Sequence, residues 1–213
     1  LPVAARLRKR IPVGAGLAGG SSNGAAMVAA LNDLFELGLS EATMIDLVCR
    51  LGSDLAFFFH APSAIVTGRG EHVAAAPLGG TIHLVLMTPN FGCATGAVYR
   101  TFDEMAADAA VDESRVRALA GQWPLPDDAP FNDLAAPACR VAPQLDELRR
   151  QVRHAVGRPV HVTGSGSGMF IVVGDADEAR QIAELIQCDL HLPTRAVRAL
   201  TPPAADDPAP RGT

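Results

Sequence analysis

The residues best suited to chemistry form a glycine-rich segment, residues 12–23, which reads Pro-Val-Gly-Ala-Gly-Leu-Ala-Gly-Gly-Ser-Ser-Asn. Its four glycines leave the backbone free to adopt positive φ and to approach a ligand with no Cβ in the way. Ser21, Ser22 and Asn23 are residue types that cap helices, and an apolar-periodic helix is predicted immediately after them. A glycine-rich turn that presents unpaired N–H groups and the positive end of a helix is an anion site, most often for phosphate. The Arg-Lys-Arg run at residues 8–10 adds positive charge to it.

Two known phosphate loops can be compared with this segment. The P-loop pattern requires a lysine after its glycines, whereas the only lysine of the chain, Lys9, precedes them. Gly14, Gly16 and Gly19 match the dinucleotide fingerprint G-x-G-x-x-G, but that fingerprint follows a buried apolar strand and precedes an acidic residue about 20 positions on. Here the preceding residues are basic, and the candidate acids lie inside the predicted helix. A dinucleotide site and a purely structural turn remain as less favoured alternatives.

Asp54 is the best candidate for a general base. It follows Gly52 and Ser53 at a predicted helix end and precedes the apolar run at residues 55–59, which would exclude water beside a carboxylate. Phosphoryl transfer needs a group of this kind to accept the proton of the acceptor hydroxyl. From its position alone, however, a helix-stop or capping role is the favoured interpretation of Asp54.

Six segments, in order along the chain, resemble motifs of the GHMP kinases, a family that includes galactokinase, homoserine kinase and mevalonate kinase. The segments are residues 9–23, 51–58, 68–71, 89–95, 132–134 and 163–168. The form with two glycines before Ser-Ser-Asn is similar to the branch that phosphorylates the 2-hydroxyl of 4-(cytidine 5'-diphospho)-2-C-methyl-D-erythritol in non-mevalonate isoprenoid biosynthesis. The resemblance implies an ATP- and Mg²⁺-dependent phosphotransferase.

The resemblance also implies site residues. Asp54 matches the catalytic carboxylate, Ser22 is expected to meet Mg²⁺, and the serines of the loop are expected to meet the β- and γ-phosphates. The expected ATP-binding residues are Lys9, Pro12, Val13, Gly14, Ala15, Gly16, Leu17, Ala18, Gly19, Gly20, Ser21, Ser22 and Asn23. The expected substrate-binding residues are Thr95, Gly164, Ser165 and Gly166. Simpler structural roles stay open: N-capping for the serines and for Thr95, and a plain hairpin turn for residues 163–168.

The chain departs from the family pattern at its start and at Ala56, where the family usually has proline. Family members open with strands that bear a catalytic lysine and base-gripping aromatic and histidine residues, whereas Lys9 matches a lysine just upstream of the loop. We therefore expect the first domain to be incomplete. The alternatives to the kinase are a catalytically incomplete ATP-binding fragment, another GHMP kinase and, third, an NAD-dependent oxidoreductase.

The composition of the chain argues against several classes of binding partner. The 213 residues are 48% hydrophobic and carry a net charge of −5, with one lysine and one tyrosine, which argues against a nucleic-acid surface. No apolar run is long enough for a membrane span, and no signal peptide is visible. The four cysteines are widely spaced, as expected for reduced thiols. We expect a cytoplasmic monomer or homodimer that acts on a small molecule without nucleic acid or membrane.

These residues must be positioned by an α+β chain of two parts, with the GHMP-kinase two-domain fold. Residues 1–76 are expected to form a remnant of a ribosomal-protein-S5-like domain, residues 77–200 a ferredoxin-like domain, and residues 201–213 a disordered tail. Gly38 is expected to stop the first helix, and Ser40 to cap a second helix that ends at Gly52. Strands are expected at residues 64–67, 82–87, 159–162, 169–173 and 195–200, and later helices at 97–107, 143–156 and 175–186.

Overall fold

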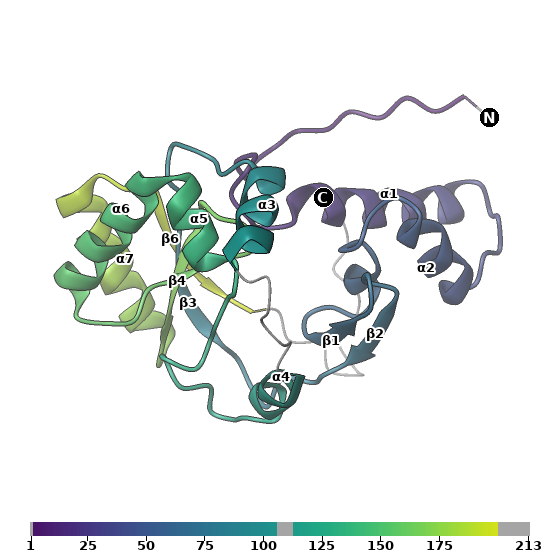
Figure 1. Ribbon diagram of the computed structural model, residues 1–213. Coiled ribbons are helices and arrows are strands. Elements are labelled where there is room, and N and C mark those ends of the chain that lie inside the picture. The colour runs from purple at the N-terminus through teal and green to yellow at the C-terminus, as the bar shows by residue number, and fades with distance from the viewer. Residues whose placement is uncertain (1, 106–112, 200–213) are drawn as a thin grey trace.

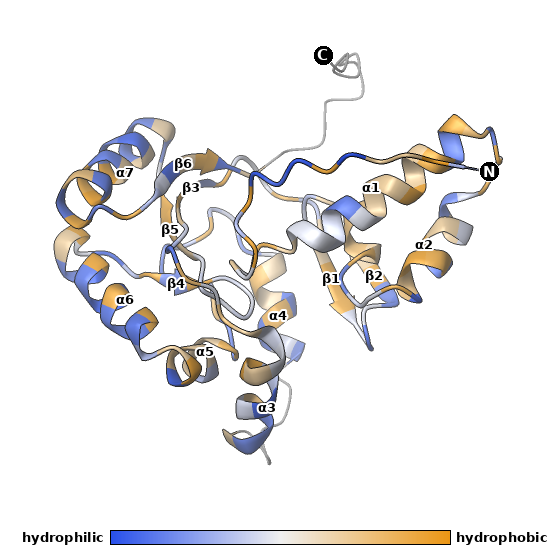
Figure 2. Ribbon diagram, turned by 90° about the horizontal axis from the view of Figure 1, so that it is seen from above, coloured by the Kyte–Doolittle hydropathy of each residue, from blue (hydrophilic) through white to orange (hydrophobic). Residues whose placement is uncertain are grey.

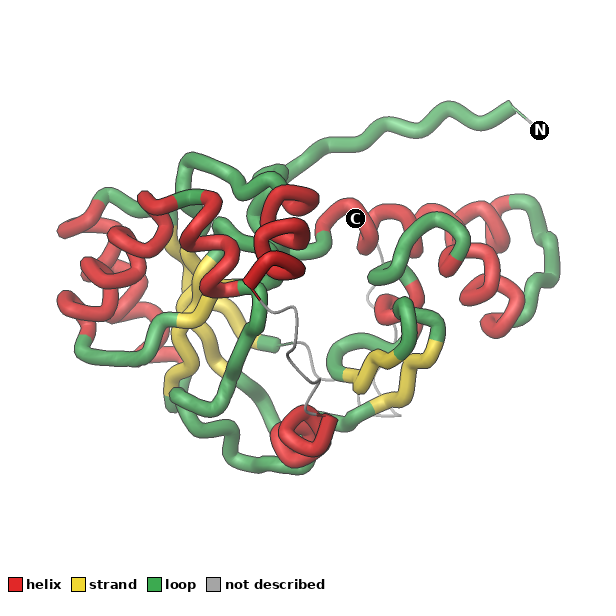
Figure 3. The backbone as a smooth tube through the Cα atoms, viewed as in Figure 1, coloured by secondary structure: helices red, strands yellow, loops and turns green. Residues whose placement is uncertain are grey.

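The computed structural model of the chain describes residues 2–105 and 113–199. It combines helices with two antiparallel sheets, as Figures 1 and 3 show. The helices are α1 (Gly19–Leu34), α2 (Glu41–Cys49), the 3₁₀ helix η1 (Ala56–Phe59), α3 (Thr95–Met105), α4 (Glu113–Ala120), α5 (Ala135–Val141), α6 (Pro143–Val156) and α7 (Ala176–Leu190). The strands are β1 (Ala64–Thr67), β2 (His72–Ala75), β3 (His83–Met87), β4 (His161–Val162), β5 (Met169–Val173) and β6 (Thr194–Arg198).

The second part of the chain is built on a four-stranded sheet with the order β4-β5-β3-β6, in which every neighbouring pair is antiparallel. In the central register, Val85 of β3 lies opposite Ile171 of β5 and Ala196 of β6. One or more helices separate β3 from β4, and α7 separates β5 from β6, so the chain follows the β-α-β-β-α-β course of a ferredoxin-like domain. The expected fold of this part is confirmed.

The helices α6 and α7 cover one face of this sheet, on the left in Figure 1. Alternate residues of the two central strands point toward them, so Val85, Met87, Met169 and Ile171 are completely buried. Both helices carry apolar residues on one side and charged residues on the other, visible as mixed orange and blue in Figure 2. The main hydrophobic core of the described chain lies between these helices and the sheet.

The first part consists of α1, α2, η1 and the hairpin of β1 and β2, in which Val66 lies opposite Val73. Its small core is centred on Val48, Leu55 and Ala56. Residues 2–10 form an exposed segment that leads to the glycine-rich loop and runs roughly parallel to α1 in Figure 1. The two cores fall on either side of the boundary expected near residue 76, which itself stays a prediction.

Most of the expected elements are present. The helix at 143–156 and the strands at 64–67 and 169–173 are confirmed with the same bounds. Ser40 caps α2, as predicted, by accepting a hydrogen bond from the Thr43 N–H at 3.2 Å. Asp175 caps α7 in the same way through the Glu178 N–H, but α7 continues to Leu190 instead of ending at 186.

Other expectations were wrong or lie outside the described residues. Gly38 does not stop α1: the helix ends at Leu34, and Glu36 already takes a left-handed φ of +49°, so the chain has turned before the glycine. The strand β2 and the helices α4 and α5 were not expected. The end of the helix at 97–107 and the tail at 201–213 lie outside the described residues. Within residues 2–105 and 113–199, no helix is long and apolar enough to cross a membrane.

Candidate active site

The glycine-rich loop turns directly into α1. Gly14 and Gly16 have φ values of +75° and +64°, which favour glycine, and Ala18 at the N-cap position has a φ of +47°. Because this left-handed turn redirects the chain, α1 begins at Gly19, earlier than expected. Residues 21–23 therefore lie inside the helix, and their expected role as caps was wrong: no side chain caps α1.

The N-terminus of α1 is open. The first intrahelical bond joins the Ser22 N–H to the Ala18 carbonyl oxygen at 2.9 Å. The N–H groups of Gly19, Gly20 and Ser21 come before it, and within the described residues none of them donates to a backbone carbonyl. A Cβ added at Gly20 would meet no atom within 4 Å, so the space beside this turn is free. The arrangement has the donors and the access that an anion requires.

Lys9 brings a second positive charge to the same point. A Cβ added at Gly19 would lie 3.5 Å from the Lys9 Nζ. In the part of the chain that the structure describes, Lys9 forms no ion pair. A lysine ammonium beside the positive end of a helix is electrostatically unfavourable unless an anion lies between them. The pair therefore favours a phosphate as the ligand.

One cavity of about 430 Å³ collects most of the predicted site residues. It is lined by Lys9, Ile11, Pro12, Val13, Gly14, Ala15, Gly16, Leu17, Ala18, Gly19, Gly20, Asp54, Thr95, Tyr99, Leu134, Gly164 and Ser165. Four predicted site residues are not among those that line it: Ser21, Ser22, Asn23 and Gly166. Three residues of the lining were not among the predicted site residues: Ile11, Tyr99 and Leu134. Tyr99 lies four residues after Thr95 on α3, and this helical spacing was the signal that could have found it.

The second glycine loop, residues 163–168, packs against the first. The Thr163 hydroxyl donates to the Gly16 carbonyl oxygen at 3.0 Å, and the Gly168 N–H donates to the Ala15 carbonyl oxygen at 3.1 Å. A Cβ at Gly16 would overlap the Thr163 carbonyl oxygen, so only glycine permits this approach. The loop does connect β4 and β5 as a hairpin, but it also supports the phosphate loop from behind.

Asn132 holds the second loop in place. Its side-chain amide nitrogen donates to the carbonyl oxygens of Val162 and Gly164, at 2.9 and 2.8 Å. Its amide oxygen accepts the Leu134 N–H at 3.0 Å. Three hydrogen bonds from one side chain fix the loop relative to the segment before α5. The 132–134 motif therefore has a positioning role, which the sequence analysis did not assign.

Two predicted substrate residues meet across the cavity wall. The hydroxyl oxygens of Thr95 and Ser165 are 3.0 Å apart, although the residues are 70 positions apart in the sequence. Thr95 is the first residue of α3, and the carbonyl oxygen of Ala94 already accepts the N–H groups of Ala97 and Val98. A capping role for Thr95 is therefore not supported. Its hydroxyl and that of Ser165 present a polar pair at the cavity.

Asp54 lies at the other side of the phosphate loop, between α2 and η1. Its side chain is exposed and makes no hydrogen bond or ion pair within the described residues, so a capping role is not supported. It lines the main cavity and an adjoining one of about 430 Å³, which also contains Phe57 and Phe58. The two rings form an edge-to-face pair with centroids 5.2 Å apart. The expected combination of a carboxylate and an apolar wall is present.

The described residues include no group of three or more His, Cys, Asp or Glu side chains that could hold a metal by themselves. Kinases usually bind Mg²⁺ through one or two carboxylates together with the phosphates of the nucleotide. Among the described residues, Asp54 is the only carboxylate residue that lines the cavity, whereas Ser22 lies outside its lining. The donor set therefore fits Mg²⁺ that arrives with a nucleotide.

Cys93 lies where the two glycine loops meet. Its N–H donates to the Gly14 carbonyl oxygen at 3.2 Å, and a Cβ added at Gly166 would lie 3.2 Å from its Sγ. Burial raises the pKa of the Cys93 thiol and that of Cys139. Within the described chain all four cysteines are free, so Cys93 acts as a small packing residue.

The structure does not support a dinucleotide site. The dinucleotide fingerprint needs parallel strands joined through a helix. In residues 2–105 and 113–199, every strand pair is antiparallel, and residues 2–10, which precede the glycine loop, form no strand.

Comparisons with known proteins identify the family of this chain. Residues 1–61 match the family described as the GHMP kinases N terminal domain. The 4-diphosphocytidyl-2-C-methyl-D-erythritol kinase of Moorella thermoacetica is 36% identical over 189 residues, which cover 85% of this chain and 65% of the relative. The enzyme of that name from Thermodesulfovibrio yellowstonii is 32% identical over 206 residues, covering 92% and 70%. The chain thus spans somewhat less than two thirds of the first of these relatives.

Solved structures show the same relationship. A crystal structure of 4-(cytidine 5'-diphospho)-2C-methyl-D-erythritol kinase matches with a TM-score of 0.67 and 33% identity, covering 90% of this chain and 68% of the other. Homoserine kinase from Cytophaga hutchinsonii shares the fold, with a TM-score of 0.66 at 14% identity, covering 91% and 68%. The chain therefore belongs to the GHMP kinase family, in which its named relatives are 4-diphosphocytidyl-2-C-methyl-D-erythritol kinases.

Proposed function

We propose that this chain carries the ATP site and the catalytic carboxylate of an ATP-dependent kinase. The acceptor is the 2-hydroxyl of 4-(cytidine 5'-diphospho)-2-C-methyl-D-erythritol, a step of non-mevalonate isoprenoid biosynthesis. The observation that carries the proposal is the single cavity in which an open helix N-terminus, Lys9 and Asp54 meet. The names of its relatives supply the substrate.

The phosphates of ATP bind at the start of α1. The N–H groups of Gly19, Gly20 and Ser21 donate to phosphate oxygens, and Lys9 neutralises part of their charge. Residues 12–18 form the wall along which the nucleotide lies. Mg²⁺ bound together with the nucleotide would offset the charge that develops on the transferred group. Ser22, one position further into α1, is the residue of this chain that we assign to the metal.

Asp54 accepts the proton of the substrate hydroxyl as the phosphoryl group is transferred. Its carboxylate is free of protein partners within the described residues and lies beside the apolar wall of Phe57 and Phe58. Thr95 and Ser165, together with Gly164 and Gly166, orient the acceptor through hydroxyl and backbone groups. We further propose that the protein works in the cytoplasm on a small-molecule substrate, as a monomer or homodimer, without nucleic acid or membrane.

A catalytically incomplete ATP-binding protein of the GHMP type is the second candidate. One observation favours it: in the part of the chain that the structure describes, Lys9 is the only cationic side chain that lines the cavity, and it lies at the helix terminus. Phosphoryl transfer generally uses additional cationic groups beside the transferred group, which neutralise its negative charge. This candidate predicts nucleotide binding without turnover.

The two candidates separate in an assay of ATP-dependent phosphorylation of 4-diphosphocytidyl-2-C-methyl-D-erythritol, with Mg-ATP affinity measured in parallel. We expect Asp54→Asn to retain ATP affinity and to lose turnover by about 10²–10⁴-fold, as is typical when a general base is removed. Asp33→Asn, at an exposed position of α1 outside the cavity, is the matched control and should keep full turnover. Normal turnover of the Asp54→Asn variant would contradict a catalytic role for Asp54. Mg-ATP binding without any transfer by the unmodified protein would favour the second candidate.

A further inference from the structure

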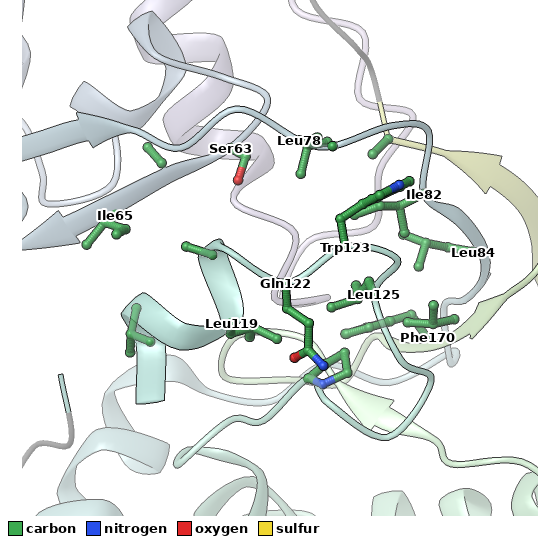
Figure 4. A pocket seen from close by; sticks show the side chains of 17 residues that line it. Ser63, Ile65, Leu78, Ile82, Leu84, Leu119, Gln122, Trp123, Leu125 and Phe170 are labelled. Carbon is green, nitrogen blue, oxygen red and sulfur yellow. The ribbon is translucent and has the colours of Figure 1, made fainter. Parts of the chain in front are cut away.

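A second cavity, of about 360 Å³, lies on the face of the four-stranded sheet opposite α6 and α7. Its floor is formed by Leu84 of β3 and by Phe170 and Val172 of β5, which alternate with the buried residues of the main core. The start of β1, the helix α4 and residues 122–125 form its walls, as Figure 4 shows. None of the described residues that line this cavity lines either of the two cavities that contain Asp54.

The described lining is apolar and uncharged. Among residues 2–105 and 113–199, no Asp, Glu, Lys, Arg or His side chain contributes to it, and apart from the Trp123 indole only Ser63 and Gln122 offer polar side-chain groups. The proposed active site, in contrast, contains Lys9 and Asp54. A cavity of this size that is mostly apolar, with a few polar groups, is typical of a site for a small organic ligand. Charged ligands would lose hydration here without gaining a partner.

Trp123 supplies a flat wall whose position is fixed. Its indole ring lies against Gly79 and Gly80, and a Cβ at either glycine would overlap the ring. Trp123 as a residue is nevertheless 44% exposed, so it is not sealed in by its neighbours and can stack on a ligand. In Figure 4 the Gln122 side chain lies between those of Leu119 and Leu125. Its carboxamide has no hydrogen-bond partner among the described residues and can serve a ligand.

From these features we propose that this cavity is a second ligand site, for a small, uncharged and largely apolar molecule. The molecule presents a flat ring or conjugated face to Trp123 and one hydrogen-bonding group to Gln122. The proposal does not depend on the proposed kinase activity, because the two sites share no residue and differ in charge.

The test uses N-phenyl-1-naphthylamine, an uncharged aromatic probe with a single N–H donor, added to the intact protein. Trp123 is the only tryptophan of the chain, so energy transfer from tryptophan to the probe reports binding beside it. We expect saturable binding of one probe per chain, with quenching of the Trp123 emission. Saturating Mg-ATP should leave the probe bound. Absence of saturable binding, or displacement by Mg-ATP, would overturn the proposal.

Two variants on α4 locate the probe. Ala120→Phe places a ring in the cavity and should weaken binding by about tenfold or more. Ala118→Phe adds the same ring at an exposed position two residues earlier that does not line the cavity, and should change affinity by less than about twofold. Circular dichroism verifies folding. If Ala120→Phe does not fold, Ser63→Phe fills the cavity from the β1 side and should have the same effect. Unchanged affinity in a folded filling variant would also overturn the proposal.

Discussion

Replacing Gly16 with alanine should damage the protein far more than replacing Gly20, although both glycines belong to the same loop. Gly16 has a φ of +64°, and its Cβ would overlap the carbonyl oxygen of Thr163 and lie 2.9 Å from the Gly166 nitrogen. The two glycine loops would have to separate. Gly20 has an ordinary φ, and its Cβ would enter open space.

The size of the effect follows from these contacts. An L-residue in the left-handed region costs about 1–2 kcal/mol. Separating the loops also breaks three hydrogen bonds, from Thr163 Oγ1 to Gly16, from Gly168 N–H to Ala15 and from Ser167 N–H to Gly14, each with a net contribution of about 1 kcal/mol. The sum, about 4–5 kcal/mol, corresponds to a decrease in Tm of about 8–20 °C for a domain of this size.

Thermal unfolding followed by circular dichroism measures this decrease, with Gly20→Ala as the matched control. Alanine has the higher helix propensity, so the control should unfold at the original Tm or a few degrees above it, a gain of at most about 1 kcal/mol. If Gly16→Ala unfolded within about 2 °C of the unmodified protein, the close packing of the two loops would be refuted.

Other predictions concern the second loop and the thiols. Asn132→Ala removes three hydrogen bonds and should lower the Tm, measured by calorimetry, by about 6–12 °C. The control Asn90→Ala changes an exposed residue and should leave the Tm nearly unchanged. Equal effects of the two substitutions would contradict the positioning role of Asn132. Burial raises the pKa of Cys93 and Cys139, so at about pH 8 iodoacetamide should label the exposed Cys188 first, and equal labelling rates by mass spectrometry would contradict this. Because the folded thiols ionise at higher pH than the unfolded ones, their stabilising contribution is complete below the unfolded pKa and is lost as pH rises through the folded pKa.

The sequence predicted the parts of this structure that local pattern determines. Strong local signals predicted the amphipathic helices α6 and α7, the apolar strands β3 and β5 and the Ser40 N-cap. The structure contains each of these features. The residue types around the phosphate loop and Asp54 identified most of the cavity lining for the same reason. The resemblance of these residues to GHMP kinase motifs then predicted phosphoryl transfer as the reaction at this cavity.

What the sequence did not reveal depends on tertiary contacts or weak local signals. The start of α1 is set by the left-handed conformation of Ala18, which no propensity would assign to alanine. The helix α5, which reads Ala-Ala-Pro-Ala-Cys-Arg-Val, lacks a clear apolar period. The contact between Thr95 and Ser165 and the two hydrogen bonds from Asn132 to Val162 and Gly164 join segments 30 or more residues apart, which no local pattern could predict.

The central claim, that ATP phosphates bind at the open N-terminus of α1, is tested most directly by isothermal titration with Mg-ATP. Gly20 and Gly96 are the second residues of α1 and α3, so Gly20→Val and Gly96→Val carry the same helix-propensity cost, and only Gly20 lines the cavity. We predict one saturable site that Gly20→Val weakens by about tenfold or more and that Gly96→Val leaves unchanged. Equal Mg-ATP affinity in a folded Gly20→Val protein, or binding of NADH with no binding of ATP, would contradict the account.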